Sequence, residues 1–288
     1  MVRVAPAVPA GPVARDAGGS SVVELARPRF RPDPTADREA MVQLQHDIAE
    51  TAVFADQFGF DPGAVGGSAD STDTEAESDP PLVAGVDQAF LDDRAVSAVV
   101  VSRGSEVIER THAVTATRLP YVPGLLSFRE GNPIFAALAT LETDPDVYVI
   151  DGSGRLHYRQ AGLATHVGVA VDAPTVGVAK SLLCGTLDAD PDGRPAGWRT
   201  PIRADAEVDA SDGTVIGAAL QTRQYDERPV INPVYVSPGH RVSAATATDL
   251  VERLCDGYKL PEPTRRADSH AETAKSRVDD SGAGSDGG

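Results

Sequence analysis

The sequence predicts an α/β fold: a mixed sheet, in which three antiparallel strands are followed by parallel strands, flanked by helices. Apolar runs of strand length open the folded region, and shorter apolar runs then alternate with segments of helical periodicity. With 288 residues, 41% of them apolar, the chain can bury the core of one large domain or two small ones. A wholly disordered, collagenous or disulfide-framework chain is excluded.

The start of the chain is expected to be irregular. Residues 1–34 are rich in Ala, Pro, Gly and Arg without a sustained period, which predicts a loosely ordered lead-in. An apolar stripe of helical spacing follows over 35–58, with Thr35 and Asp37 as candidate N-caps. Residues 61–81 hold six acidic and no basic side chains among Gly, Ser and Pro, which predicts a solvated linker or insertion.

The folded region follows this insertion. The expected elements are, in order, strands over 82–90, 95–103 and 107–117, a helix over 125–142, a strand over 146–150, a helix over 161–171, strands over 175–178, 214–221 and 234–237, and a helix over 244–255. The sequence LDDR between the first two strands favours a hairpin, and Asp144 with Pro145 ends the first helix. These elements predict one domain over 35–266 and a polar, Gly/Ser-rich disordered tail over 267–288.

The charge balance is strongly acidic. The chain carries 26 Lys and Arg against 43 Asp and Glu, a formal charge of −17, and its only lysines are Lys180, Lys259 and Lys275. This balance is typical of a protein that stays soluble in multimolar salt, where the Debye length falls to about 3 Å and self-repulsion is screened. A nucleic-acid partner is therefore not excluded, but its binding cannot depend on counterion release, which weakens as salt rises.

Two classes of protein are disfavoured. The longest apolar stretches, such as 95–101 and 167–171, are far shorter than the ~20 residues that span a bilayer, so we predict no membrane partner and a cytoplasmic location. Cys184 and Cys255 can form at most one bridge and lack zinc-finger spacing, which favours two reduced, buried thiols.

Three acidic residues form a candidate metal site. Asp87 interrupts the apolar strand VAGVDQAF, and Asp151 ends the strand in VYVIDGSG, where open α/β sheets place their ligands. Either one alone is more often a turn or capping residue. Glu130 lies on the helix between those strands and by itself fits a solvated helix face. Three converging carboxylates would repel one another without a cation, which predicts one or two divalent metal ions.

Six blocks in a fixed order carry a resemblance to a known family. VAGVDQAF, LPYVPGLLSFREG, YVIDGSGRLHYRQAGLATHVGV, PTVGVAKSLLCG, VYVSPGHRVS and PEPTR together run from Leu82 to Arg266 and resemble endonuclease V, the deoxyinosine 3′ endonuclease. PYVPG with SFREG, and GVAKSLLCG, are long and unusual strings. The resemblance implies an RNase H-like fold and a single catalytic domain over 35–266, here from an acidic, halophile-like protein.

The resemblance also implies roles for five residues. Asp87, Glu130 and Asp151 match the family's acidic positions that bind Mg²⁺, for which Mn²⁺ is a substitute. Lys180 matches a lysine that contacts the phosphate, and His240, in SPGH, matches the active-site histidine. A metal ion would neutralise the scissile phosphate and polarise the attacking water, which His240 could orient or deprotonate. The alternative for His240 is a polar surface residue in a Ser-Pro-Gly turn.

The loop PYVPG resembles the family's wedge. Pro120 and Pro123 would stiffen it so that Tyr121 fills the gap left by a base turned out of the stack; the alternative is a loop whose tyrosine packs on its own domain. The positions that match the family's base pocket are Gly124, Leu126, Gly152, Gly154 and His157. His166 also matches the family, but a histidine on an apolar helix is more often a core residue. Gln88, Arg155 and Tyr158 depart from the family's usual residues and bear on substrate preference.

The resemblance implies a monomeric DNA repair endonuclease. It would recognise deoxyinosine, which is deaminated adenine, and hydrolyse the second phosphodiester bond 3′ to it, leaving 3′-hydroxyl and 5′-phosphate ends. Two alternatives remain: an inosine-directed RNA nuclease or another RNase H-like structure-selective nuclease, and a protein that binds damaged nucleic acid without cutting it.

Overall fold

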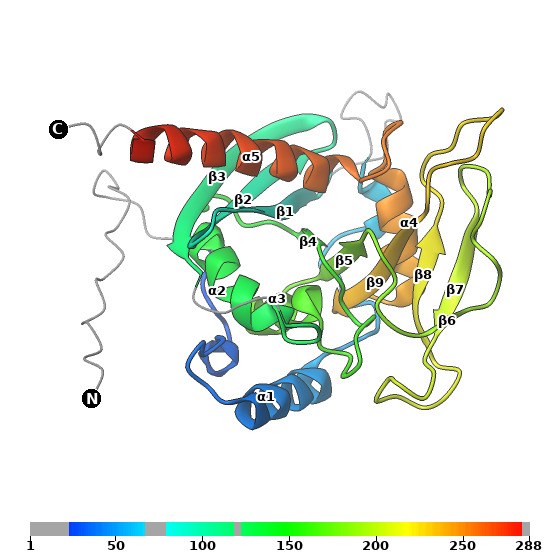
Figure 1. Ribbon diagram of the computed structural model, residues 1–288. Coiled ribbons are helices and arrows are strands. Elements are labelled where there is room, and N and C mark those ends of the chain that lie inside the picture. Colours follow the sequence, from blue (N-terminus) through cyan, green and yellow to red (C-terminus); the bar gives the residue numbers. More distant parts are fainter. Residues whose placement is uncertain (1–22, 67–78, 118–121, 284–288) are drawn as a thin grey trace.

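One mixed sheet dominates the computed structural model, which describes residues 23–66, 79–117 and 122–283. Within these ranges nine strands follow the spatial order β3-β2-β1-β4-β5-β9-β8-β7-β6 (Figure 1). The strands are β1 (Leu82–Phe90), β2 (Arg94–Arg103), β3 (Glu106–Ala116), β4 (Val147–Asp151), β5 (Thr175–Ala179), β6 (Thr186–Leu187), β7 (Arg199–Arg203), β8 (Val215–Leu220) and β9 (Val234–His240). The helices are η1 (Pro28–Phe30), α1 (Arg38–Thr51), η2 (Pro62–Ala64), α2 (Leu126–Leu138), α3 (Leu163–Val171), α4 (Ala244–Arg253) and α5 (Glu262–Ala283).

The strand directions confirm the predicted mixed sheet. β1, β2 and β3 are an antiparallel meander, and β4 and β5 pair parallel to β1 and to each other. β9 returns antiparallel to β5 and connects the sheet to β8 and β7. The carboxyl ends of β1, β4 and β5 therefore meet at one edge of the sheet, where parallel strands place their ligands.

Two apolar layers cover the two faces of the sheet. Side chains such as Val86 and Ile150 pack with α2 and α3 on one face, and Val83 and Val149 belong to the cluster around α4 on the other. In Figure 1, α5 lies above β1 to β3, while α2 and α3 lie below them and α1 lies below α3. The alternation along each strand decides which side chains reach which helix.

The N-terminal lead-in is more ordered than predicted over its described part. Val23 and Phe30 are buried in the core on the α3 side, and Arg27 donates to the Val169 carbonyl oxygen at 2.8 Å. The predicted N-cap of α1 is confirmed, since the Asp37 carboxylate accepts from the Ala40 amide at 2.8 Å. The overall composition of the segment did not predict these contacts, because each is made by a single residue.

The predicted disordered tail is wrong over residues 267–283. They continue the helix α5, which packs along β1 and β2. The side chains of Ala267, Ala271 and Ala274 are buried, and Ala271 packs against Ala89 and Ala98. An alanine stripe at helical spacing is a weak apolar signal within a polar sequence, yet it allows the helix to lie close against the sheet.

Two strands at the far edge of the sheet were not predicted. β7 has the sequence RTPIR, in which only Thr200 and Ile202 are buried, so its apolar alternation is too short to identify it.

Cys184 and Cys255 are free, and Cys184 is buried. In the described part of the chain no helix is long and apolar enough to cross a membrane.

Candidate active site

A cavity of about 400 Å³ opens where β1, β4 and β5 end. Four of the five predicted catalytic residues line it, namely Asp87, Glu130, Asp151 and Lys180. They come from three strand ends and from α2, so the topology brings together residues that are up to 93 positions apart in the sequence.

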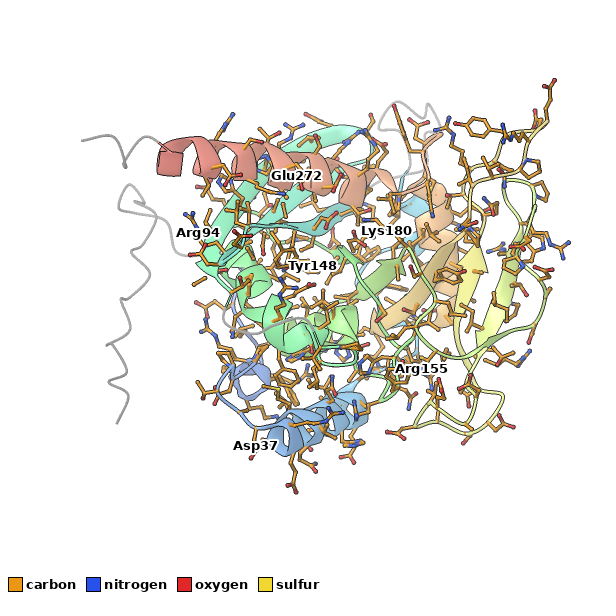
Figure 2. All side chains as sticks on the ribbon, in the orientation of Figure 1. Asp37, Arg94, Tyr148, Arg155, Lys180 and Glu272 are labelled. Atoms are coloured by element: carbon orange, nitrogen blue, oxygen red, sulfur yellow. The ribbon has the colours of Figure 1, made fainter. Side chains whose placement is uncertain are left out.

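Asp87 and Asp151 project from neighbouring parallel strands. Val86 pairs with Ile150 in the register of β1 and β4, so the two following aspartates lie side by side and point to the same face of the sheet. Lys180 follows the last residue of β5, the next strand, and its Nζ lies 2.6 Å from Asp151 Oδ2. Figure 2 shows Lys180 below α5, near the middle of the view.

The carboxyl groups are held where negative charge is costly. Burial, reinforced by the Asp151 carboxylate, raises the pKa of Asp87 to about 8. Burial also raises the pKa of Glu130 to about 7, with the Arg129 guanidinium opposing and Asp151 adding to the rise. Burial alone would lower the pKa of Lys180, but the charge and hydrogen bond of Asp151 raise it overall. The pair Lys180–Asp151 thus compensates one of the three acids, whereas Asp87 and Glu130 form no ion pair with another described residue.

The donor set fits a divalent metal ion. Asp87 Oδ1 accepts from the Gln88 amide at 2.6 Å, whereas its buried Oδ2 has no hydrogen-bond partner among the described residues. Carboxylate oxygens are the ligands that Mg²⁺ prefers. As the described side chains stand, no three acidic, imidazole or thiol groups are gathered closely enough to enclose an ion, and Asp151 is paired with Lys180. Binding would therefore require small side-chain movements around Asp87.

A fourth acid faces this cluster and was missed from the sequence. Asp268, on α5, contributes to the raised pKa values of both Asp87 and Lys180. The string PEPTRRAD was the signal in the sequence, because Asp268 lies within three residues of the last matching block, but the segment from residue 267 was predicted to be a disordered tail. The position of α5 over β1 is what brings this side chain to the sheet edge.

A second group of residues that line the cavity lies around Gly124. Four of the predicted base-pocket positions, Gly124, Leu126, Gly152 and His157, belong to the lining. Gly124 has a φ of +76°, a conformation that favours glycine, and a Cβ there would lie 3.4 Å from the Tyr158 ring. The sequence VPGLL therefore turns sharply into α2 at the wall of the cavity.

Two side chains hold the Gly124 carbonyl oxygen. Gln45 Nε2 donates to it at 2.8 Å, and His157 Nε2 lies 3.1 Å away. Because His157 Nδ1 accepts from the Arg159 amide at 3.2 Å, the proton is on Nε2 and the ring donates to Gly124. Burial lowers the pKa of His157 to about 4, so the ring is neutral. Arg159 also donates to Gln45 Oε1 at 3.0 Å, which ties α1 to this wall.

Two of the described substrate-binding positions, Gly154 and Pro123, are not among the residues that line the cavity. Gly154 lies behind it, where its amide donates to Ser237 Oγ at 2.8 Å and a Cβ would come within 2.3 Å of the Pro238 carbonyl oxygen. Its role is close packing of the chain. Pro123 is an exposed turn residue, and Pro120 and Tyr121 lie outside the described residues, so the wedge stays a prediction.

His240 does not belong with the acids. It pairs with Thr175, the first residue of β5, whereas Lys180 follows the last, which separates the two ends by roughly 17 Å along the strand. Its ring is buried, with Nδ1 accepting from the Val53 amide and Nε2 3.1 Å from Asp172 Oδ1. This geometry does not support the predicted catalytic role of His240, because Nδ1 is engaged by Val53 and Nε2 by Asp172. His166 is buried as well, 2.6 Å from the Phe30 carbonyl oxygen.

The departures from the family pattern have structural roles. Gln88 Nε2 donates to the Glu130 carbonyl oxygen at 2.9 Å and so links β1 to α2 beside the acids. Arg155 donates to Gln160 Oε1 at 2.8 Å and lies over the Phe54 ring, which ties the loop after β4 to the N-terminal segment. Its side chain lies low in Figure 2, well below Lys180.

Comparisons with known proteins agree with this geometry. A family model described as Endonuclease V matches residues 68–269. Endonuclease V of Haloarcula marismortui is 57% identical over 269 residues, which cover 89% of this chain and 99% of the relative. The crystal structure of endonuclease V from Bacillus subtilis is 27% identical with a TM-score of 0.70 and covers 86% of this chain and 97% of that one.

A third comparison includes a nucleic acid. Endonuclease V of Ciona intestinalis, solved with a 24-mer DNA containing an inosine followed by a ribo-adenosine, has a TM-score of 0.67 at 23% identity, covering 83% of this chain and 98% of that one. At this identity the likeness supports the fold alone. The family implies a nuclease with a divalent-metal cofactor. The match over most of its length shows that this chain belongs to the endonuclease V family, as the motifs between residues 82 and 266 predicted.

Proposed function

We propose that this protein is a DNA repair endonuclease that recognises deoxyinosine and hydrolyses the second phosphodiester bond 3′ to it. The observation that carries the proposal is the meeting of Asp87, Glu130 and Asp151 at one cavity, whose other wall is formed by Gly124 and His157. Support for inosine as the recognised base comes from the Ciona intestinalis family member, which was solved with inosine-containing DNA. Mg²⁺, with Mn²⁺ as a substitute, is the proposed cofactor.

The acids supply the chemistry of the site. Asp87, Glu130 and Asp151 would hold the metal ion, and the free Oδ2 of Asp87 is the oxygen best placed to accept it. When bound, the ion neutralises the scissile phosphate and polarises the attacking water. Lys180 would exchange its contact with Asp151 for a phosphate oxygen once that carboxylate has a metal partner. Asp268 adds a fourth carboxylate within electrostatic range of this cluster.

Proton transfer falls to the groups that line the cavity. With His240 at the other end of the sheet, the oxygen of Glu130 that does not hold the metal ion would be left to accept a proton from water. The nucleophile would be that water rather than a side chain. The products would be a 3′-hydroxyl and a 5′-phosphate.

The other side of the cavity would receive the base. The Gly124 carbonyl oxygen already accepts from Gln45 and His157, so these two side chains fix the wall rather than contact the base themselves. The backbone of Gly152 and the side chain of Leu126 remain available at the surface of the cavity. Action as a monomer stays a prediction from the family resemblance.

Mapping of the cut tests the proposal. A 5′-labelled duplex with one deoxyinosine, incubated with Mg²⁺ in high KCl, should give one product that ends one nucleotide beyond the inosine. That product should be extended by a DNA polymerase, because its end is a 3′-hydroxyl. Cutting only of a matching inosine RNA would assign the site to RNA, and metal-independent binding without any cut would make the protein a binding protein.

A further inference from the structure

A second groove lies on the flank of α5 that faces β3. It has a volume of about 480 Å³ and is polar, with Ser105, Arg110, Arg266, Ser269, His270 and Thr273 among its lining residues. We call these six residues the basic groove. It is cationic in a protein whose formal charge is −17, and none of its residues takes part in the site described above.

Two basic stripes face each other across this groove. Arg266, His270, Thr273 and Arg277 follow the spacing i, i+4, i+7 and i+11 and so share one face of α5. Arg110 and His112 alternate along β3 and point to the same side of the sheet. The rings of His112 and His270 meet edge to face with their centroids 5.3 Å apart, which brings the two stripes into contact.

The positive charge of the groove is only partly compensated. Arg266 is paired with Glu262 and donates to the Ser105 carbonyl oxygen. Arg110 and Arg277 are exposed and have no ion pair or hydrogen bond with any described residue. Burial, followed by the charges of His112, Arg110 and Arg277, lowers the pKa of His270, and burial followed by Arg277 lowers that of His112. No carboxylate offsets these effects, and the shielded Nε2 of His270 has no partner in the described chain.

The groove and the acids lie on opposite flanks of one helix. Asp87 pairs with Ala98 and Ala98 with His112, so the aspartate and the histidine are at the same level of the sheet, two strands or roughly 10 Å apart. Ala271 packs on Ala98 between them. On α5 itself, Asp268 acts on the acids while His270 lines the groove. A strand bound at the acids can therefore reach the groove by crossing α5.

We propose that the basic groove is an anion site that binds a phosphate group, and that in function this phosphate belongs to the backbone of the nucleic-acid strand, away from the scissile bond. The second part rests on the proposed function. Guanidinium groups are suited to phosphate because they donate in a fork, and the unpartnered imidazole adds a further donor. Direct contact is the form of attraction that persists in concentrated salt, where longer-range attraction is screened.

The anion site is tested with inorganic phosphate and the full-length protein. The histidine ring protons are followed by NMR as phosphate is added, with His112→Gln and His270→Gln used for assignment. A bound anion should raise the pKa of His112 and His270 and shift their resonances in a saturable way, while His46, which lies on α1, stays unchanged. If neither His112 nor His270 shifts more than His46 does, the proposed anion site is wrong.

The contact with the strand is tested by binding without cleavage, in EDTA. Arg110→Gln combined with Arg277→Gln should weaken binding to inosine and adenine duplexes equally, by about three- to tenfold, because backbone contacts carry no sequence information. The slope of log affinity against log salt should fall by about 1 for each arginine removed. The control for each arginine is Arg228→Gln, which removes one positive charge from the exposed loop between β8 and β9.

The outcomes separate the two proposals. Equal affinities for the double variant and the wild type would overturn the strand contact, and a phosphate response of the histidines would then assign the groove to free phosphate. A wild type that does not distinguish inosine from adenine would contradict the proposed function while the phosphate titration still reports on the groove.

Discussion

Asp87 shows how a single residue connects folding to function. Its carboxyl group is buried next to Asp151, and one of its oxygens has no partner in the described chain. A buried acid without a cation destabilises the ionised form, so its pKa rises. The metal ion proposed at this carboxylate would restore the ionised form.

The first prediction concerns stability without metal. Because the folded-state pKa of Asp87, about 8, is above its ordinary value of 3.8, the folded protein binds more protons than the unfolded chain between these values. The metal-free protein should therefore lose stability as the pH rises from about 4 to 8. Asp87→Asn should be more stable than the wild type at pH 8, by about 1–3 kcal/mol, in urea unfolding with EDTA.

Metal should reverse this pH dependence. Binding requires ionised carboxylates, so the affinity for Mg²⁺ should rise with pH through the range of the Glu130 and Asp87 pKa values, about 7 to 8. Calorimetry in buffers of different ionisation enthalpy would show protons released on binding near pH 7. Binding without proton release would contradict the raised pKa values.

A second prediction concerns Gln45. Gln45→Leu removes a buried donor to the Gly124 carbonyl oxygen and leaves Arg159 without its partner, at a cost of about 1–3 kcal/mol in unfolding free energy. Preference for inosine over adenine should fall, because the wall of the base pocket loosens. Gln43→Leu is the matched control on the exposed side of α1. If both variants keep the wild-type preference, Gln45 does not position the pocket.

Sequence reasoning succeeded at the residue scale where a motif coincided with a strand end. Asp87, within one apolar strand, and Asp151, at the end of another, were predicted to meet on adjacent strands, and β1 and β4 do pair side by side. His240 also ends a strand, but β9 runs antiparallel to β5, so its end lies at the opposite edge. Strand direction in β9 is set by pairing with distant strands and is not encoded in the motif SPGH itself.

At the scale of elements, α5 is the main difference between prediction and structure. Its sequence is mostly polar, and the face that packs on β1 and β2 consists of small alanines. This narrow apolar stripe lets the helix lie close to the sheet but gives little apolar signal in the sequence. Ala271→Leu should force the helix from the sheet, cost about 1–3 kcal/mol and slow cleavage by displacing Asp268. Stability and single-turnover cleavage measure the two effects.

The control for this variant is on the same helix. Glu272→Leu adds a similar side chain at the neighbouring position, which is exposed. It should leave stability and cleavage close to wild type. Equal effects of the two substitutions would show that α5 does not depend on close packing at Ala271.

Other elements were predicted to within a few residues, since their apolar periods are strong. Strands β1 to β5 and helices α2 to α4 follow from alternation, helical spacing and caps such as Ser243, which accepts from the Thr246 amide. The short strands β6 and β7 could not be predicted from their weak patterns, because they form by pairing, β7 with β8 and β6 with β7.

At the scale of the whole molecule, the charge of −17 predicts a salt-dependent stability. Thermal unfolding should shift to higher temperature as KCl rises, because screening removes self-repulsion of the folded state. The rise should be steepest at low salt and flatten near 1 M, where the Debye length is about 3 Å. Scanning calorimetry against KCl concentration tests this, and stability that is independent of salt below 1 M would contradict it.

Cleavage by matched variants tests the account most directly. Single-turnover rates are measured on a deoxyinosine duplex and an adenine duplex in high KCl, with Mg²⁺ or EDTA, for the wild type, Asp87→Asn and His240→Gln. The account predicts one metal-dependent cut 3′ to inosine, a loss of at least about a thousandfold for Asp87→Asn, and retained chemistry in the folded fraction of His240→Gln. Wild-type cleavage by Asp87→Asn, or its abolition by His240→Gln in a folded protein, would contradict it.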